Sequence, residues 1–163
     1  MRQTAEIKLR RSIRLLIILF IVSIVLSGIT AFPIESELAL AHNNINHFPE
    51  FLRDWISKVY FAVKGTNENY PFLAYGTDWL AFAHLVIAVA FVGPLRDPVK
   101  NVWVIQWGMI SCLMVFPLAL IAGPIRQIPF YWQLIDCTFG VVGITLLYIC
   151  YRKILALKKI ELN

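Results

Sequence analysis

The sequence has few charged residues for its length. Charged residues make up 15% of the 163 positions, whereas apolar residues make up 59%. Soluble domains usually carry about 25% charged residues, so this deficit indicates an integral membrane protein.

The three cysteines are too few and too scattered to form a disulfide framework or a zinc knuckle. Cys112, Cys137 and Cys150 are odd in number, lie inside apolar runs and show no C-x-x-C spacing. We therefore expect them to be small packing residues within helices.

The chain also lacks the short motifs of common catalytic sites. It contains no P-loop, no G-x-G-x-x-G after a strand, no H-E-x-x-H and no G-x-S-x-G. The formal net charge is +5, but the basic residues stand at the ends of apolar runs and not in a stripe with interleaved aromatics. This distribution argues against a nucleic-acid partner.

What the chain does contain is four long apolar runs. They cover residues 13–31, 76–94, 102–123 and 130–150, and each is long enough for a membrane-spanning helix of about 20 residues. We expect an all-α integral membrane protein in which four transmembrane helices form one bundle and one membrane domain. A cleaved signal peptide is the alternative for the first run, which exceeds the usual apolar core of about 7 to 15 residues.

The segment 32–74, between the first two runs, has helical periodicity of its own. Apolar residues recur at helical spacing from Pro49, charged residues fill the other side, and Gly65 is a plausible end. This pattern predicts an amphipathic helix that lies on the membrane surface or caps the bundle.

The basic residues predict the orientation. Eleven of the fifteen Lys and Arg residues lie in the N-terminal tail, in the loop between the second and third spans, or in the C-terminal tail. The other four are Arg53, Lys58, Lys64 and Arg126. Since cytoplasmic loops carry the excess of basic residues, both termini should be cytoplasmic and segment 32–74 extracytoplasmic.

Helical spacing places small and polar residues on one face of each later span. These residues are Ala81, His84 and Ala88 in the second span; Gly108, Cys112, Val115, Ala119 and Gly123 in the third; and Gln133, Asp136, Gly140 and Gly143 in the fourth. Helices in lipid pack through such faces, so we expect them to point into the bundle. A carboxylate facing lipid costs about 2.5–3.5 kcal/mol at a helix centre, so Asp136 needs an interior partner or a proton. Pro117 should kink the third span or loosen its hydrogen bonding.

A polar group of residues is predicted in the extracytoplasmic half of the bundle and forms the candidate ligand-binding site. Its members are Asp78, His84, Arg126, Gln133 and Asp136. Each has a structural alternative. Asp78 stands at a helix start, where it favours capping or the helix dipole, and His84 is equally suited to packing. Arg126 and Asp136 are also suited to an ion pair that ties the loop to the bundle.

A metal site is the alternative for the histidines. His42 or His47, together with His84 and with Asp78 or Asp136, would supply ligands suited to zinc or iron. His42 and His47 are five residues apart and do not share a helical face, so surface histidines are the default expectation.

Two stretches resemble a known family. They are YPFLAYGTDWLAFAHLVIAVAFVGPLRDPVKNVWVIQ and GPIRQIPFYWQLIDCTFG, within residues 69–143, with SGITAFPIESEL at the end of the first span. They resemble a family of small bacterial four-helix inner-membrane proteins that carry no assigned activity. The resemblance implies the bacterial inner membrane as location and assigns no catalytic residue.

Three functions follow as hypotheses. The first is a protein that binds a lipid, quinone or small anionic ligand in the polar pocket, without catalysis. The second is an intramembrane metal-dependent hydrolase or transferase that uses His84 and Asp136. The third is an oligomeric structural or proton-coupled transport subunit. Membrane lipids and a second copy of the chain are the expected partners, and no cofactor is specified.

Overall fold

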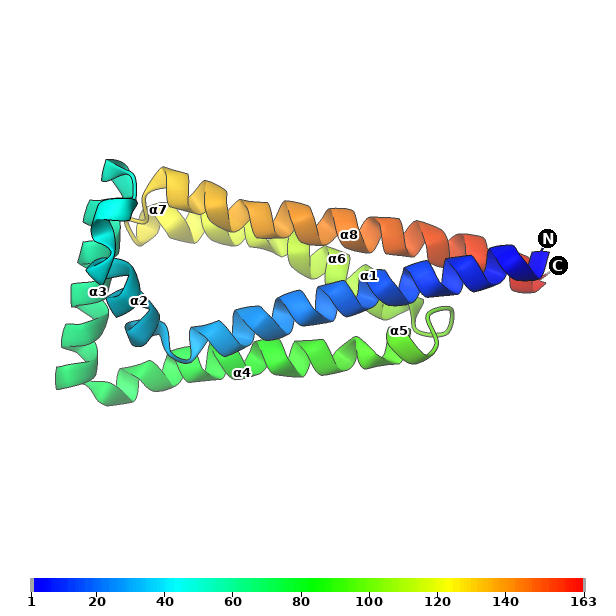
Figure 1. The fold of residues 1–163 in the computed structure, drawn as a ribbon, viewed down its shortest axis with the longest axis horizontal. Helices are drawn as coiled ribbons and strands as arrows, with labels where there is room; N and C mark the ends of the chain where they lie inside the picture. Colours follow the sequence, from blue (N-terminus) through cyan, green and yellow to red (C-terminus); the bar gives the residue numbers. More distant parts are fainter. Residues whose placement is uncertain (1, 163) are drawn as a thin grey trace. The chain divides into compact units, whose positions relative to one another are not determined.

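The structure, a computed structural model, describes residues 2–162. All regular elements in this range are helical, as predicted (Figure 1). In chain order they are α1 (Arg2–Ala31), α2 (Ile34–Asn43), the 3-10 helix η1 (Ile45–His47), α3 (Glu50–Asn69), the 3-10 helix η2 (Pro71–Ala74), α4 (Tyr75–Ala90), α5 (Val92–Arg96), α6 (Val102–Pro117), the π-helix η3 (Leu118–Ala122), α7 (Gly123–Ile125) and α8 (Phe130–Leu162).

Within the described residues, four helical stretches are long and apolar enough to cross a membrane. They are Glu6–Ala31, Pro71–Arg96, Val102–Ile125 and Phe130–Glu161. Large apolar side chains are exposed along them, as at Leu113, Met114 and Leu118. Water does not tolerate contiguous apolar surface of this extent, whereas lipid does. The four predicted spans are therefore confirmed as helices of the required length and composition.

Two of these helices extend further than the sequence predicted. α8 continues through the basic C-terminal segment. At 1.5 Å per residue the whole helix is about 50 Å long, which exceeds the hydrocarbon thickness of about 30 Å. α1 already begins at Arg2, where the i,i+4 pair of Glu6 and Arg10 (2.9 Å) supports it. Near the end of α8, Ile154 and Leu157 are buried, so packing holds this extension helical.

The packing divides the chain into two compact units. Unit 1 contains the residues up to Val22 and those from Val89 onward, and unit 2 is Ser23–Ala88. Each unit is described by itself below.

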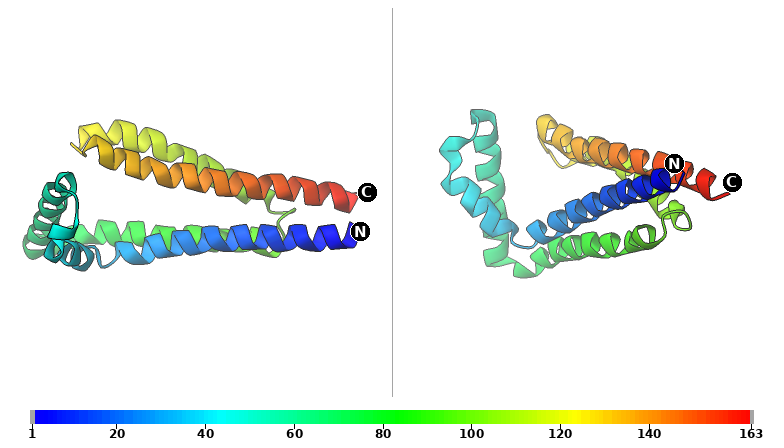
Figure 2. Two further views of the ribbon diagram at one scale, coloured as in Figure 1. Left: turned by 45° about the horizontal axis from the view of Figure 1, so that its top comes forward. Right: turned by 45° about the vertical axis from the view of Figure 1, so that its right-hand side comes forward.

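Unit 1 is built on the pairing of α6 with α8, which run side by side in all views (Figures 1 and 2). Glycines make the close contacts. A Cβ on Gly140 would lie 2.9 Å from the carbonyl oxygen of Cys112, and one on Gly143 would lie 2.6 Å from the Cys112 sulfur. The small-residue faces predicted for these two spans therefore meet, as expected from packing in lipid.

Phe91, at the junction of α4 and α5, is the centre of the apolar packing in unit 1. Its side chain is fully buried, and its ring centroid lies 4.6 Å from that of Phe20 and 6.3 Å from that of Trp107. Gly108 admits the ring, because a Cβ there would lie 2.7 Å from its tip. Phe91 thus lies between Phe20 of α1 and Gly108 of α6 and joins these two helices.

Pro117 changes the hydrogen bonding of the third span, as predicted. The π-helix η3 begins directly after it, at Leu118. Proline has no N–H, so the carbonyl of Leu113 lacks its usual donor and the ladder shifts to wider spacing.

Unit 2 contains a helical hairpin where the sequence predicted a single amphipathic helix. α2 packs antiparallel to α3, and the stacked rings of His42 and Tyr60 (4.8 Å) join the two helices. At the other end of the hairpin, Asn67 Nδ2 donates to Glu35 Oε2 at 2.7 Å. The sequence did not predict α2, whose ten residues precede the periodic pattern that begins at Pro49.

The predicted end of α3 at Gly65 is wrong. The helix continues to Asn69, and a Cβ on Gly65 would meet nothing within 4 Å. Tyr70, the residue that follows the helix, has a non-helical φ of −139°, as expected for a residue that precedes a proline, here Pro71.

The remaining contacts of unit 2 place the C-terminal end of α1 against α4. A Cβ on Gly28 would lie 2.9 Å from both the Ala81 carbonyl oxygen and the His84 Cβ. α3 runs across the direction of α4 (Figures 1 and 2). This arrangement suits an amphipathic helix in the plane of a membrane surface.

Candidate functional site

The turn between α7 and α8 is a Schellman motif, the hydrogen-bonded helix end that usually contains glycine. The Ile128 N–H donates to the Gly123 carbonyl at 2.9 Å, and the Gln127 N–H donates to the Pro124 carbonyl at 3.0 Å. Gln127 takes the left-handed conformation, with φ of 58°. Arg126 is the residue at the helix end, so a fixed backbone presents its side chain.

Gln133 braces this turn from the first turns of α8. Its side chain is only 4% exposed, and its Nε2 donates to the Ile128 carbonyl at 2.8 Å. A Cβ on Gly123 would lie 2.6 Å from the Gln133 side chain, so the two residues are packed together. The prediction that Gln133 points inward is confirmed, but its amide nitrogen serves the turn.

Arg126 and Asp136 do not form the ion pair that the sequence suggested. Arg126 is exposed, Asp136 is half-buried, and neither side chain has a hydrogen bond or ion pair with any residue in the described range 2–162. Asp136 stands six residues into α8, about 9 Å along its axis, whereas Arg126 extends from the turn. Because Asp136 lies this far along α8 from the turn, the contact between α8 and the turn is made by Gln133, through its hydrogen bond to the Ile128 carbonyl.

His84 and Asp78 belong to unit 2 and have local structural roles. His84 Nδ1 donates to the Leu80 carbonyl at 2.7 Å, and its Cβ packs at Gly28. These contacts favour the packing interpretation of this histidine. Asp78 lies in the first turn of α4, where its charge complements the helix dipole.

The structure does not assemble the metal alternative. No group of three or more His, Cys, Asp or Glu side chains suited to a metal ion occurs among residues 2–162. His42 lies on Tyr60 with its Nδ1 3.3 Å from the Ser57 hydroxyl, and His47 Nδ1 is 3.3 Å from the Asn44 carbonyl. Each histidine thus has its own neighbours.

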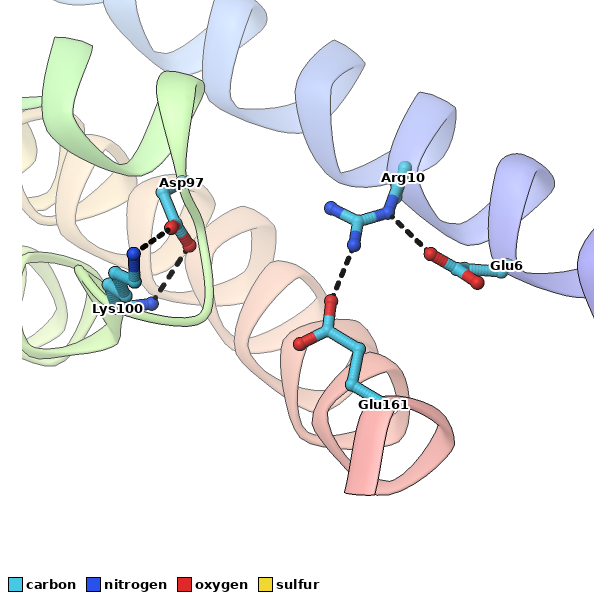
Figure 3. Close-up of polar contacts among 5 residues, drawn as sticks. All are labelled: Glu6, Arg10, Asp97, Lys100 and Glu161. Carbon is cyan, nitrogen blue, oxygen red and sulfur yellow. Dashed lines mark hydrogen bonds and ion pairs between the residues drawn. The ribbon is translucent and has the colours of Figure 1, made fainter. Parts of the chain in front are cut away.

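The other end of unit 1, formed by the first turns of α1 and the last turns of α8, carries a polar network, whereas the sequence predicted only an orientation from the basic residues there. Arg10 contacts Glu6 at 2.9 Å and Glu161 at 2.5 Å, which ties the start of α1 to the end of α8 (Figure 3). The first turns of α1 and the last turns of α8 therefore lie together. That this side is cytoplasmic stays a prediction.

The loop that joins α5 to α6 lies in the same unit. Asp97 Oδ1 accepts the Lys100 main-chain N–H at 3.1 Å, and Lys100 Nζ is 3.5 Å from Oδ2 (Figure 3). The main-chain hydrogen bond, helped by the Lys100 charge, lowers the pKa of the Asp97 carboxyl below its ordinary value.

Two surface grooves accompany the basic end of unit 1. The larger, about 500 Å³, is lined by Ile7, Arg10, Arg11, Arg14, Leu15 and Ile18 of α1. The smaller, about 330 Å³, is lined by Leu9, Tyr148, Ile149, Arg152, Lys153 and Ala156, from α1 and α8. The signal that could have revealed the larger groove is the helical spacing of Ile7, Arg11, Arg14 and Ile18.

Known proteins offer no guide to the role of the Arg126 turn or of the two grooves. No protein family, curated protein or solved structure matches the chain. The resemblance to bacterial four-helix inner-membrane proteins stays a prediction. What the chain and its structure establish together is an all-helical protein with four helices able to cross a membrane.

Proposed function

We propose that the chain is a non-enzymatic, multi-pass protein of the bacterial inner membrane that binds an anionic ligand at the turn between α7 and α8. Arg126 is the residue that contacts the anion. The observation that carries the proposal is that this guanidinium is exposed and has no ion pair with residues 2–162, while its backbone is fixed.

The surroundings of Arg126 fit a ligand at the membrane surface. Tyr131 and Trp132 follow in the first turn of α8, and such side chains concentrate at headgroup depth. An anionic lipid headgroup or a small anion that approaches from the extracytoplasmic side meets Arg126 there. A guanidinium holds phosphate or carboxylate through two parallel hydrogen bonds, which a lysine does not reproduce.

Native mass spectrometry of the protein purified with its co-extracted lipids tests this proposal. We expect a retained anionic ligand that disappears in Arg126→Ala. Lys64→Ala is the matched control, because it removes a basic side chain of α3 that pairs with Glu68 and should leave the ligand in place. A ligand-free wild-type spectrum, or equal loss in both variants, would refute the proposal.

A second candidate function is favoured by Asp136. Its carboxylate lies inside the fourth span, half-buried, and has no hydrogen bond or ion pair with the described residues of its own unit. Such a group suits a contact with a second copy of the chain or a proton transfer. Asp136→Asn should then abolish a crosslinked dimer or a proton flux in proteoliposomes. A monomer without flux in bilayers argues against this function.

A further inference from the structure

The larger groove, on α1, presents charge and apolar surface in a fixed order along the helix. Arg11 and Arg14 are one turn apart on the same face, and Leu15 and Ile18 follow toward the middle of the span. Lys8, on the same helix, does not line the groove. The groove is therefore a defined face of α1, and other parts of the basic tail lie outside it.

The charges in this groove are unequal in their availability. Arg10 is held by Glu6 and Glu161, so its charge is balanced within the protein. Arg11 and Arg14 are exposed, and within residues 2–162 neither has an ion pair. Arg11 and Arg14 are thus available to bind an anion, whereas Arg10 holds α1 against α8.

The order of charge and apolar surface identifies the chemistry of the occupant. Leu15 and Ile18 are exposed and belong to the apolar part of the span. Arg11 lies about one turn nearer the start of the span than Leu15, and Arg14 lies about one turn nearer it than Ile18. A free phosphate would use only the arginines. A molecule with a negative headgroup and hydrocarbon chains would use both parts of the groove.

The smaller groove, between α1 and α8, repeats this combination. Arg152 NH1 donates to the Tyr148 hydroxyl at 3.1 Å, and Lys153 lies beside it on the wall. Ile149 and Leu9 supply the apolar surface. The same end of unit 1 thus presents basic and apolar side chains together on two neighbouring faces.

We propose that the α1 groove binds an anionic phospholipid, with the phosphate on Arg11 and Arg14 and the acyl chains along Leu15 and Ile18. This site lies at the end of unit 1 opposite the Arg126 turn, so it goes beyond the function proposed above. It gives the protein selectivity for the lipid that surrounds its basic end.

Native mass spectrometry with added lipid tests the site in the full-length protein. The protein in micelles is incubated with equal amounts of phosphatidylglycerol and phosphatidylcholine of the same chain length. We expect retention of phosphatidylglycerol in preference to phosphatidylcholine, and Arg11→Gln/Arg14→Gln should reduce this preference about 30-fold. Arg11→Lys/Arg14→Lys, which keeps both charges, should retain most of the preference.

The matched control is Lys8→Gln/Lys159→Gln, which removes two charges from the same end but none from the groove, and should leave the preference unchanged. Equal retention of the two lipids by the wild type would overturn the inference. An equal loss in the Lys8/Lys159 control would do so as well, as would displacement of the bound lipid by excess inorganic phosphate.

Discussion

The turn before α8 contains the only non-glycine residue with positive φ among residues 2–162, Gln127. A side chain in this conformation places its Cβ against the following carbonyl, at a cost of about 1–2 kcal/mol. The Schellman hydrogen bonds and the buried amide of Gln133 hold the turn despite that cost. Such retained strain in the segment that presents Arg126 agrees with a fixed, functional turn.

Replacement of Gln127 by glycine should therefore stabilise the protein. We expect a gain of about 1 kcal/mol in the free energy of unfolding, because glycine adopts positive φ without steric cost. Circular dichroism during unfolding in mixed micelles of rising sodium dodecyl sulfate content measures it. Gln127→Ala keeps the Cβ and should bring no gain, and a Gly variant that is no more stable than the Ala variant would contradict the account.

The Asp97 carboxylate should titrate below its usual pKa of about 3.9 in an unfolded chain. Because its pKa is lowered in the folded protein, the carboxylate contributes to loop stability above the unfolded-state pKa. This contribution is lost as the pH falls through the folded-state pKa. A carboxyl ¹³C NMR titration measures it. Most of the lowering should persist in Lys100→Gln, because the main-chain N–H is its first cause. A midpoint at or above the unfolded value would contradict the contact.

At the scale of elements, glycines set how closely α6 and α8 approach. Gly140 lies against the Cys112 carbonyl, an atom that cannot move aside as a flexible side chain can. Gly65 of α3, by contrast, has open space around its missing Cβ. The contact of α6 with α8 thus requires a glycine at position 140, whereas α3 has room for a larger residue at position 65.

This difference predicts opposite effects of two substitutions. Gly140→Val should destabilise the protein by about 1–3 kcal/mol through overpacking. Gly65→Ala should stabilise it by about 0.5–1 kcal/mol through helix propensity alone. Both are measured by unfolding in the same mixed micelles. A Gly140→Val protein as stable as the wild type would show that α6 and α8 are not in the described contact.

The periodicity of small residues predicted the α6 and α8 faces because packing in lipid depends on residue size, which a sequence displays directly. The glycine that packs α1 on α4 was missed. Gly28 lies in that contact, against the Ala81 carbonyl oxygen and the His84 Cβ. The fold of the hairpin was missed as well, since α2 depends on a tertiary contact between His42 and Tyr60.

The candidate site was less predictable than the spans. The sequence placed Arg126 in a turn and Gln133 facing inward, both of which the structure contains. It did not reveal that Gln133 would bond to the Ile128 carbonyl, because that depends on a left-handed Gln127. The sequence did not reveal the α1 groove. Basic residues at span ends are expected in any membrane protein because they set its orientation, so their presence does not by itself indicate a binding site.

At the scale of the whole molecule, both proposals depend on one claim. The chain is proposed to cross the membrane four times, with both termini on the cytoplasmic side and the α2–α3 hairpin and Arg126 outside. The terminal contact of Arg10 with Glu161 agrees with an even number of crossings. The four apolar helices supply that number.

Cysteine labelling from one side of the membrane tests this claim most directly. In a variant with Cys112, Cys137 and Cys150 replaced by alanine, single cysteines are introduced at exposed positions outside the spans. These are Glu37→Cys and Arg126→Cys on one side, and Lys100→Cys on the other. A membrane-impermeant maleimide added to intact bacterial cells should label Glu37→Cys and Arg126→Cys, and should label Lys100→Cys only after the cells are permeabilised. Labelling of Lys100→Cys in intact cells, or protection of Glu37→Cys, would contradict the account.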